Sequence, residues 1–279
     1  MSRRHELEQR LRKLGEIGEI MRSMKNLALM ETRKLARFLD AQEESVHMIE
    51  MAAADFLKFH PNIDYQAIAG KQIFLLVGSE RGFCGDFNEE LLNALGSQTS
   101  PDSPILAVGG KLCTRLDKHP GLMGQFDGPA VAEDVPKTLN QLIPAIGHLQ
   151  ETQACHGLTV LHHRSGIEGI ARKSLLPPFT EGSKTVAALS HPPLLNLSPE
   201  SFFAELVHHY LFAALHEIFY TSLMAENQRR IQHLEGAIQR LEEKNENLAR
   251  KSRTLRQEEI TEEIEVILLS VEGNGYAWH

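Results

Sequence analysis

The chain has 279 residues and carries 37 acidic against 29 basic residues, a formal net charge of −8. This balance argues against nucleic acid as a general partner, and the length suits one large domain or two smaller ones. The three cysteines form neither a paired framework nor a metal-binding spacing, which is typical of a reducing compartment.

The N-terminus and the hydropathy of the chain bear on its location. No run of about 20 apolar residues is present that could span a membrane. The basic N-terminus lacks the apolar core of a signal peptide. Four acidic residues break the acid-poor pattern of a mitochondrial presequence: Glu6, Glu8, Glu16 and Glu19. We therefore expect a protein at the cytoplasmic face of a bacterial or archaeal membrane.

Residues 3–59 are free of proline and predict one long helix. Apolar residues recur every seven positions, a spacing typical of a coiled coil, and the row fails only at Gln42. The row consists of Leu7, Leu14, Met21, Ala28, Leu35, Ile49 and Phe56, and the row beside it of Leu11, Ile17, Met24, Phe38 and Ala53. Gly15 and Gly18 each cost about 1 kcal/mol of helix stability, so the first turns are expected to be loose.

The middle of the chain alternates strand and helix patterns. Buried strands are predicted at 73–78, 105–109 and 158–162, and helices near 88–95, 111–116 and 137–149. This alternation predicts an α/β body with an open, mostly parallel, Rossmann-like sheet covered on both faces. The segments 96–104 and 120–129 are expected to be loops, and 177–199 a linker. The expected domains are a helix at 1–60, a body at 70–180 and a helix at 199–272.

The turn from Ser79 to Asn88 follows the first predicted strand and is the best local candidate for a site. Ligands of open α/β sheets bind at the carboxyl ends of strands, and Gly82 and Gly85 could free backbone amides for an anion. The Walker and dinucleotide-binding patterns are nevertheless absent, and Gly109-Gly110-Lys111 lacks the Ser or Thr that would follow the lysine.

Cys84 lies within this turn and is the only candidate nucleophile that the pattern offers. It could pair with His162 or His163 as a thiol and imidazole, but a packing role at a tight turn is the stronger interpretation. The fourteen histidines show no metal-ligand spacing. We expect no catalytic residue, no cofactor and no metal.

Residues 200–272 predict a second long helix. Ser198 can cap it, Pro199 fits its first position, and Gly273-Asn274-Gly275 ends it. A continuous helix of this length would measure about 110 Å, too long to be buried along its whole length in a domain of this size.

The apolar surface of this second helix changes along its length. Between Phe202 and Met224 the surface is broad and suits burial against a globular body. A narrow heptad row then follows at Leu234, Leu241, Leu248 and Leu255, while the alternate positions decay to Asn245, Ser252 and Glu259. The turn Val266–Leu269 is apolar again and requires a partner. We expect the two long helices to cover each other as an antiparallel coiled coil; an ordinary pair of core helices is the alternative.

Three stretches resemble the gamma subunit of rotary F-type ATP synthases. The turn Glu80–Asn88 is similar to that family's Asp-Arg-Gly-Leu-Cys-Gly-Gly-Leu-Asn. Near the N-terminus the matching residues are Ile20, Met24, Leu27, Ala28, Arg33 and Lys34. Toward the C-terminus, the family's Arg-Gln-x-x-Ile-Thr-x-Glu is matched by Arg256, Gln257, Ile260, Thr261 and Glu263. Upstream of these, Glu226 and Arg230 resemble its Ser-Glu-x-x-x-Arg.

The resemblance implies a central-stalk rotor that couples ion flow through a membrane ring to ATP synthesis or hydrolysis. The implied partners are alpha and beta subunits as a hexamer, an epsilon subunit and a ring of c subunits, and this chain would hold no ATP chemistry. The residues expected to contact the hexamer are Met24, Arg33, Arg256, Gln257, Thr261, Glu263, Ile267 and Leu268. Those expected to build the structural turn are Arg81, Gly82, Cys84 and Gly85.

The chain departs from the family's pattern at the C-terminal signature. Val266 stands where the family has an acid, and Ser270-Val271 replace its Gly-Ala. This divergence favours a gamma subunit of an alternative ATPase over one of a housekeeping synthase. Two other functions stay open: a coiled-coil scaffold with an α/β binding domain, and a small nucleotide- or thiol-dependent enzyme.

Overall fold

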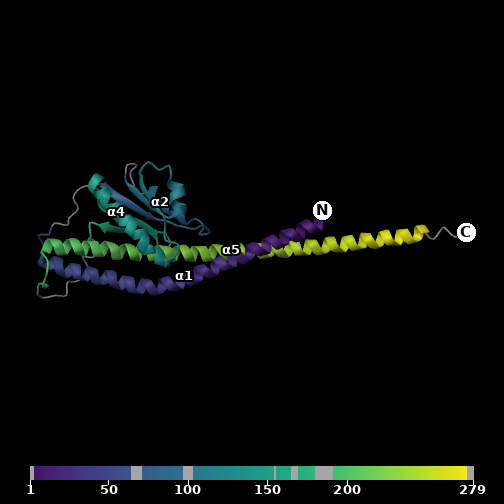
Figure 1. Ribbon diagram of the computed structural model, residues 1–279, viewed down its shortest axis with the longest axis horizontal. Helices are drawn as coiled ribbons and strands as arrows, with labels where there is room; N and C mark the ends of the chain where they lie inside the picture. The colour runs from purple at the N-terminus through teal and green to yellow at the C-terminus, as the bar shows by residue number, and fades with distance from the viewer. Residues whose placement is uncertain are drawn as a thin grey trace. The chain divides into compact units, whose positions relative to one another are not determined.

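The chain contains two long helices and a five-stranded sheet in this computed structural model, which describes residues 3–63, 71–96, 103–153, 155–164, 169–179 and 191–274. Helix α1 spans Arg3–Phe59 and helix α5 spans Pro199–Asn274 (Figure 1). The chain forms two compact units: unit 1 comprises Met1–Leu27 and Gln232–His279, and unit 2 comprises Ala28–Ile231. Both long helices contribute residues to both units. The domain boundaries expected from the sequence stay a prediction.

The sheet belongs to unit 2 and has the strand order β3-β2-β1-β4-β5. Four strands are parallel: β1 (Lys71–Val77), β2 (Ile105–Val108), β3 (Leu122–Phe126) and β4 (Cys155–His163). Strand β5 (Ile170–Leu176) pairs antiparallel with β4 at one edge. The prediction of an open, mostly parallel sheet is therefore confirmed.

The two edge strands correct the sequence analysis. Strand β3 lies inside the segment 120–129 that was expected to be a loop, and β5 was not expected at all. Strand β3 contains Gly124 and is only half-buried at alternate positions, so it lacks the continuous apolar run that marks the central strands. Strand β5 carries the polar run Arg172–Ser174 and is fully buried only at its end.

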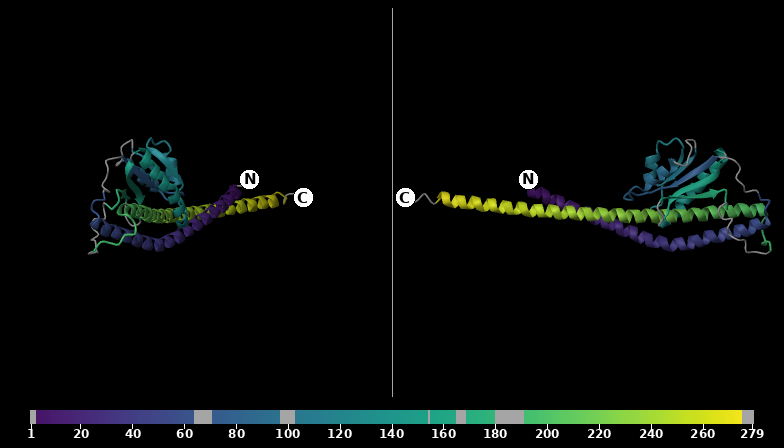
Figure 2. Two further views of the ribbon diagram at one scale, coloured as in Figure 1. Left: turned by 60° about the vertical axis from the view of Figure 1, so that its left-hand side comes forward. Right: turned by 180° about the vertical axis from the view of Figure 1, so that it is seen from behind.

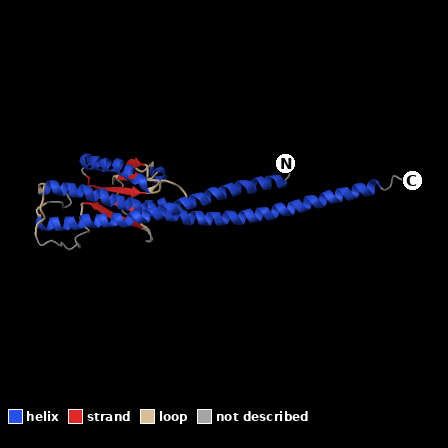
Figure 3. Ribbon diagram, turned by 60° about the horizontal axis from the view of Figure 1, so that its bottom comes forward, coloured by secondary structure: helices blue, strands red, loops and turns tan. Residues whose placement is uncertain are grey.

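Helices cover both faces of the sheet, as Figure 3 shows with the strands in red between helices. On one face, buried side chains of β1 pack against α4 (Val135–Gln153) and against α5, for example Leu75 with Leu139 and Phe219 in one apolar cluster. On the other face, Phe74 and Leu76 belong to the cluster formed with α2 (Phe87–Gly96) and α3 (Gly110–Leu116). The alternation along β1 thus divides its side chains between two cores.

In unit 2 the helices α1 and α5 run antiparallel and lie side by side (Figure 2). The Phe56 ring is 4.9 Å from that of Phe202, whereas the Phe38 ring is 5.8 Å from that of Tyr220. The heptad row of α1 faces inward. Gln42, which interrupts the row, donates its side-chain amide to the Ala213 carbonyl oxygen at 3.0 Å. The polar residue therefore keeps the inward position by hydrogen bonding instead of apolar packing.

Unit 1 is an antiparallel coil of α1 and α5, as predicted. Three ion pairs join the helices: Arg4–Glu259 at 3.1 Å, Arg22–Glu242 at 2.6 Å and Lys25–Glu235 at 3.4 Å. Residue numbers in these pairs increase along α1 and decrease along α5, as they must when the helices are antiparallel. On α5, Leu234 and Ile238 are buried in the seam. Leu241, Leu248 and Leu255 are half-buried, which confirms the heptad row read from the sequence.

Helix α1 is continuous from Arg3 through both of its glycines, and the expected looseness of its first turns stays a prediction. Gly18 is buried, and a Cβ placed on it would lie 3.3 Å from Leu241 Cδ2. Gly18 therefore lets the two helices approach closely. Ile17, which was expected in the seam, is instead 46% exposed, because the seam position beside it is occupied by Gly18.

Candidate functional site

The turn from Ser79 to Asn88 leaves the carboxyl end of β1 and is fixed by its own polar groups. Asn88 accepts a hydrogen bond from the Ser79 backbone N–H at 3.0 Å and donates to the Ser79 hydroxyl at 2.8 Å. Phe83 and Gly85 adopt left-handed backbone conformations, with φ of 66° and 65°. Gly85, a predicted residue of the structural turn, adopts this positive φ without strain because it has no Cβ. Phe83 adopts the same conformation although it is not a glycine.

Three backbone amides beside this turn are already occupied. One oxygen of the Glu80 carboxylate accepts hydrogen bonds from the N–H of Gly110 and of Gly128, each at 2.7 Å. The Lys111 N–H donates to the Ser79 carbonyl oxygen at 3.1 Å. A phosphate at this place would compete with a carboxylate for the same donors and would be repelled by it. The arrangement therefore disfavours the nucleotide-binding enzyme considered from the sequence.

Cys84 is buried, and its thiol donates to the Arg81 carbonyl oxygen at 3.6 Å. Burial raises the pKa of the Cys84 thiol, opposed by the hydrogen bond with Ser79. His163 has a different partner, since its Nε2 lies 2.7 Å from the Phe87 carbonyl oxygen. A reactive thiol requires a lowered pKa and a base that takes its proton, so this geometry disfavours the thiol-dependent enzyme.

Helix α5 holds the turn through a buried ion pair. Arg230 and Glu226, one helical turn apart, are 6% and 4% exposed, and their side chains contact each other directly. Arg230 Nε donates to the Gly82 carbonyl oxygen at 3.2 Å. Burial raises the pKa of Glu226, and the Arg230 guanidinium opposes that effect. The backbone of Arg81 and Glu80 also acts to lower the pKa of the Glu226 carboxylate.

Glu226 and Arg230 match the family's pattern in the sequence but are not among the predicted site residues. The sequence nevertheless contains a pattern that indicates a buried position for both residues. Phe219, Leu223, Glu226 and Arg230 follow one another at four-, three- and four-residue spacing, so the two charges continue the apolar stripe of α5. Opposite charges at such positions indicate a buried pair.

The neighbouring Arg229 makes a second, more exposed attachment. Its guanidinium lies 3.1 Å from the Asp86 carboxylate and 2.9 Å from that of Glu90 at the start of α2. Glu90 in turn is 3.7 Å from His163 Nδ1. Burial lowers the pKa of His163, which favours the neutral ring. Two consecutive arginines of α5 thus fasten both ends of the turn.

The other predicted contact residues lie along the two long helices. In unit 1, Met24 is half-buried on α1. The predicted residues of α5 are all exposed: Arg256, Gln257, Thr261, Glu263, Ile267 and Leu268. Arg33 is exposed on the α1 segment of unit 2. The α5 residues lie in one mostly exposed segment, interrupted by the half-buried Glu259 and separate in sequence from the turn.

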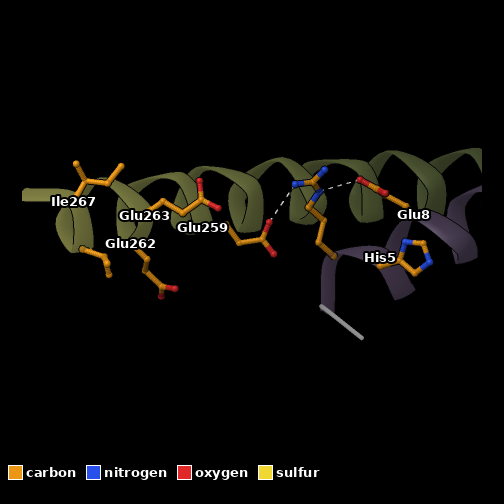
Figure 4. Close-up of a pocket in the computed structure, with 8 residues that line it drawn as sticks. His5, Glu8, Glu259, Glu262, Glu263 and Ile267 are labelled. Atoms are coloured by element: carbon orange, nitrogen blue, oxygen red, sulfur yellow. Dashed lines mark hydrogen bonds and ion pairs between the residues drawn. The ribbon is translucent and has the colours of Figure 1, made fainter. Parts of the chain in front are cut away.

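Helix α5 continues past the end of α1 in unit 1 (Figure 1). Its side chains from 260 to 270 are exposed, including Ile260, Ile264 and Val266 to Leu269. Beside Arg4 lies an open hollow of about 810 Å³, lined by carboxylates and by Val266 and Ile267. Figure 4 shows Glu259, Glu262 and Glu263 on α5, with His5 and Glu8 on α1. An apolar helix surface without covering side chains is typical of a segment that docks into another protein.

Within the described ranges, no group of three or more His, Cys, Asp or Glu side chains is placed to hold a metal ion. Of the helices that the structure describes, none is long and apolar enough to cross a membrane.

Comparisons with known proteins agree over nearly the whole chain. A relative described as the ATP synthase gamma chain of Methylacidiphilum infernorum is 22% identical over 291 residues, covering 95% of this chain and 96% of the relative. The ATP synthase gamma chain of Caldanaerobacter subterraneus is also 22% identical, covering 91% and 94%.

Solved structures share the fold. The chain resembles one from the OSCP/F1/c-ring structure of the Euglena gracilis mitochondrial ATP synthase, with a TM-score of 0.68 and 13% identity over 99% of this chain and 96% of that one. A chain of the rotor of the same enzyme gives a TM-score of 0.62, with 13% identity over 92% and 98%. The model of the family described as ATP synthase matches residues 3–272, and the chain therefore belongs to the ATP synthase gamma-chain family.

Proposed function

We propose that this chain is the central-stalk rotor subunit of an F-type ion-translocating ATP synthase or ATPase. In this function it couples ion flow through a membrane ring of c subunits to ATP synthesis or hydrolysis in an alpha/beta hexamer. The chain itself carries no catalytic residue. It associates peripherally with the cytoplasmic face of a bacterial or archaeal membrane through the complex, with an epsilon subunit as a further partner.

The observation that carries this proposal is the bare end of α5 in unit 1. An antiparallel coil gives a stiff element, and the uncovered apolar stretch at Ile264, Ile267 and Leu268 gives it a surface that an apolar bearing can hold. Around that stretch, Arg256, Gln257, Thr261 and Glu263 offer exposed polar side chains to the hexamer. Met24 and Arg33 of α1 complete the proposed hexamer contacts.

The rotor couples its rotation to ATP chemistry because its contacts with the hexamer differ from one rotation angle to the next. If each angle of the coil favours a different state of the three catalytic sites, rotation shifts which site is open, occupied or closed. Exposed and charged contacts can be exchanged at low cost, because surface ion pairs contribute only about 0–1 kcal/mol each. Such contacts suit a subunit that must turn. The departures at Val266, Ser270 and Val271 favour a complex of the alternative type.

A disulfide experiment tests the proposal. A cysteine introduced by Thr261→Cys is linked to a beta subunit in the assembled complex. Turning is then blocked, so steady ATP hydrolysis is expected to stop and to return on reduction. The matched control places Arg22→Cys and Glu242→Cys, whose native side chains form an ion pair at 2.6 Å across the coil. Linking these with a short bifunctional thiol reagent, which spans the space left by the two long side chains, joins α1 to α5 and leaves the coil free to turn as one body.

The outcomes separate the candidate functions. Full hydrolysis with the coil fixed to beta would contradict a rotor. Absence of a stoichiometric alpha/beta partner would instead favour the coiled-coil scaffold, and turnover by the isolated chain would favour an enzyme.

A further inference from the structure

The pair Glu226–Arg230 is an unusual choice of residues for a buried position. Both side chains are less than 10% exposed, although charged residues are rarely buried unless they are paired. Replacing a buried ion pair by apolar residues of similar volume is often neutral or stabilising. Stability alone therefore does not account for these residue types. Their directional hydrogen bonds offer another reason.

The polar atoms of the pair are directed at one stretch of backbone. Arg230 donates to the carbonyl oxygen of Gly82 at 3.2 Å. The neighbouring backbone of Glu80 and Arg81 acts to lower the pKa of the Glu226 carboxylate. The Gly82 carbonyl oxygen is thus bound to α5, and the peptide groups beside it face the Glu226 carboxylate. An apolar contact, which has no preferred direction, could not fix the orientation of these peptide groups.

The guanidinium is itself held in place. Arg230 also donates to the Asn227 side-chain oxygen at 2.8 Å, and Asn227 donates to the Leu223 carbonyl oxygen at 2.9 Å. Asn227 is 3% exposed. The planar guanidinium therefore meets Glu226, Asn227 and Gly82 at once, a geometry that a lysine ammonium on a flexible stem cannot reproduce.

The turn presents two exposed side chains from this fixed backbone. Arg81 is exposed, and Phe83 is 49% exposed in a left-handed conformation. Because α5 binds the carbonyl oxygen of Gly82, which lies between them in sequence, the direction in which these side chains point is set by α5 as well as by the sheet.

We propose that Glu226, Asn227 and Arg230 are positioning residues that fix the turn 79–88 rigidly on α5, so that a force applied to the turn is transmitted to α5 without the turn yielding. This inference rests on the proposed rotor function. A turn that yields under load loses part of each rotation step, and ATP hydrolysis then drives less ion transport. The residues act on coupling, and the catalytic sites in the hexamer are untouched.

The test uses Arg230→Lys in the complete complex in sealed vesicles. Lysine keeps the charge beside Glu226, so folding and assembly are retained, but it loses the bonds to Gly82 and Asn227 together. ATP hydrolysis is expected to continue, while the number of ions taken up per ATP hydrolysed against a gradient falls. In the same variant, amide hydrogen exchange of residues 80–82 is expected to accelerate. Asn227→Leu, which keeps the volume and the ion pair, is expected to give smaller changes in the same direction.

Ile218→Val on the same helix is the matched control, because it removes one buried methyl group from the apolar core and leaves the turn untouched. A merely structural role of Arg230 predicts that variants with an equal loss of thermal stability show equal coupling. Unchanged ion uptake per ATP in Arg230→Lys, or an equal fall in Ile218→Val, overturns the inference. A wild-type complex that transports no ions during hydrolysis contradicts the proposed function itself, before any variant is compared.

Discussion

The Glu80 carboxylate lies 2.7 Å from the backbone nitrogen of Gly110, and the same oxygen is 2.7 Å from that of Gly128. One side chain thereby satisfies two amides that follow different strands of the sheet. In the nucleotide-binding folds that this body resembles in outline, such amides receive a phosphate. Here the Glu80 carboxylate takes the place of the phosphate, so these amides at the carboxyl end of the sheet are not available to a ligand.

Glu80→Ala is expected to destabilise the chain. The substitution leaves two partly buried N–H groups without their acceptor, which costs on the order of 2 kcal/mol. The matched control is Glu89→Ala. Glu89 also pairs with a cation, Arg115 at 3.2 Å, but both side chains are more than half exposed, so little change is expected. Thermal unfolding of the two variants checks the prediction, and equal losses would contradict it.

Two glycines of α1 are expected to respond in opposite ways. A Cβ on Gly15 meets nothing within 4 Å, so Gly15→Ala should stabilise the helix by about 1 kcal/mol. At Gly18 the space is limited by Leu241, and Gly18→Leu would drive a side chain into the coil seam. Overpacking of this kind costs about 1–3 kcal/mol. Unfolding midpoints that move in the same direction for both variants would refute the assignment of Gly18 to close helix approach.

Elements with long repeating patterns could be predicted from the sequence, and short elements or contacts between distant residues could not. The long helices and the central strands repeat their patterns over many residues, so periodicity alone located them. Strand β3 was missed because Gly124 and half-exposed positions interrupt its pattern within five residues. Gln42 was recognised as a break in the heptad row, but its hydrogen bond to Ala213 depends on residues 171 positions away.

In the candidate site, likewise, a local pattern predicted one part and contacts between distant residues make up the rest. The turn was located from its glycines and its place after a strand. The attachment of the turn to α5 could not be located in this way, because Arg230 and Gly82 are 148 positions apart and only the fold brings them together. Similarly, α5 residues such as Thr261 were chosen by resemblance, and their contacts with other subunits stay a prediction.

Cys84→Ser is expected to leave assembly and ATP hydrolysis of the complex nearly intact. The thiol is buried and bonded to the Arg81 carbonyl oxygen, a contact that serves packing at the turn and no reaction. Placing a more polar group in this cluster should cost on the order of 1 kcal/mol of stability. The measurement compares hydrolysis per assembled complex with the unfolding midpoint. An assembled complex without any activity would restore the thiol-dependent enzyme.

The stability of the chain is expected to fall as the pH drops below about 6.5, because His162 is buried in its neutral form. Burial lowers the pKa of His162 from 6.5 to about 4, opposed by the contact of its Nδ1 with the His163 carbonyl oxygen. The nearby charges are Lys173 and Arg164, which lower the pKa further, and Glu217, which raises it.

The sign follows from proton binding. Between pH 6.5 and 4 the unfolded chain binds a proton at His162 that the folded chain does not, so stability rises with pH across this window. The contribution of His162 is fully present above pH 6.5 and is lost by pH 4. The loss is on the order of 3 kcal/mol for a shift of this size. His163, whose pKa is also lowered by burial, adds to the same slope.

His162→Phe is expected to flatten the dependence of the unfolding midpoint on pH, since the ring stays buried and no longer titrates. His47→Phe, at an exposed position on α1, controls for the substitution itself. The measurement is denaturant unfolding of the full chain at intervals between pH 4 and 7.5. A His162→Phe variant that loses stability with falling pH as steeply as the wild type would show that His162 binds its proton equally well in the folded chain, and would contradict the neutral, buried ring.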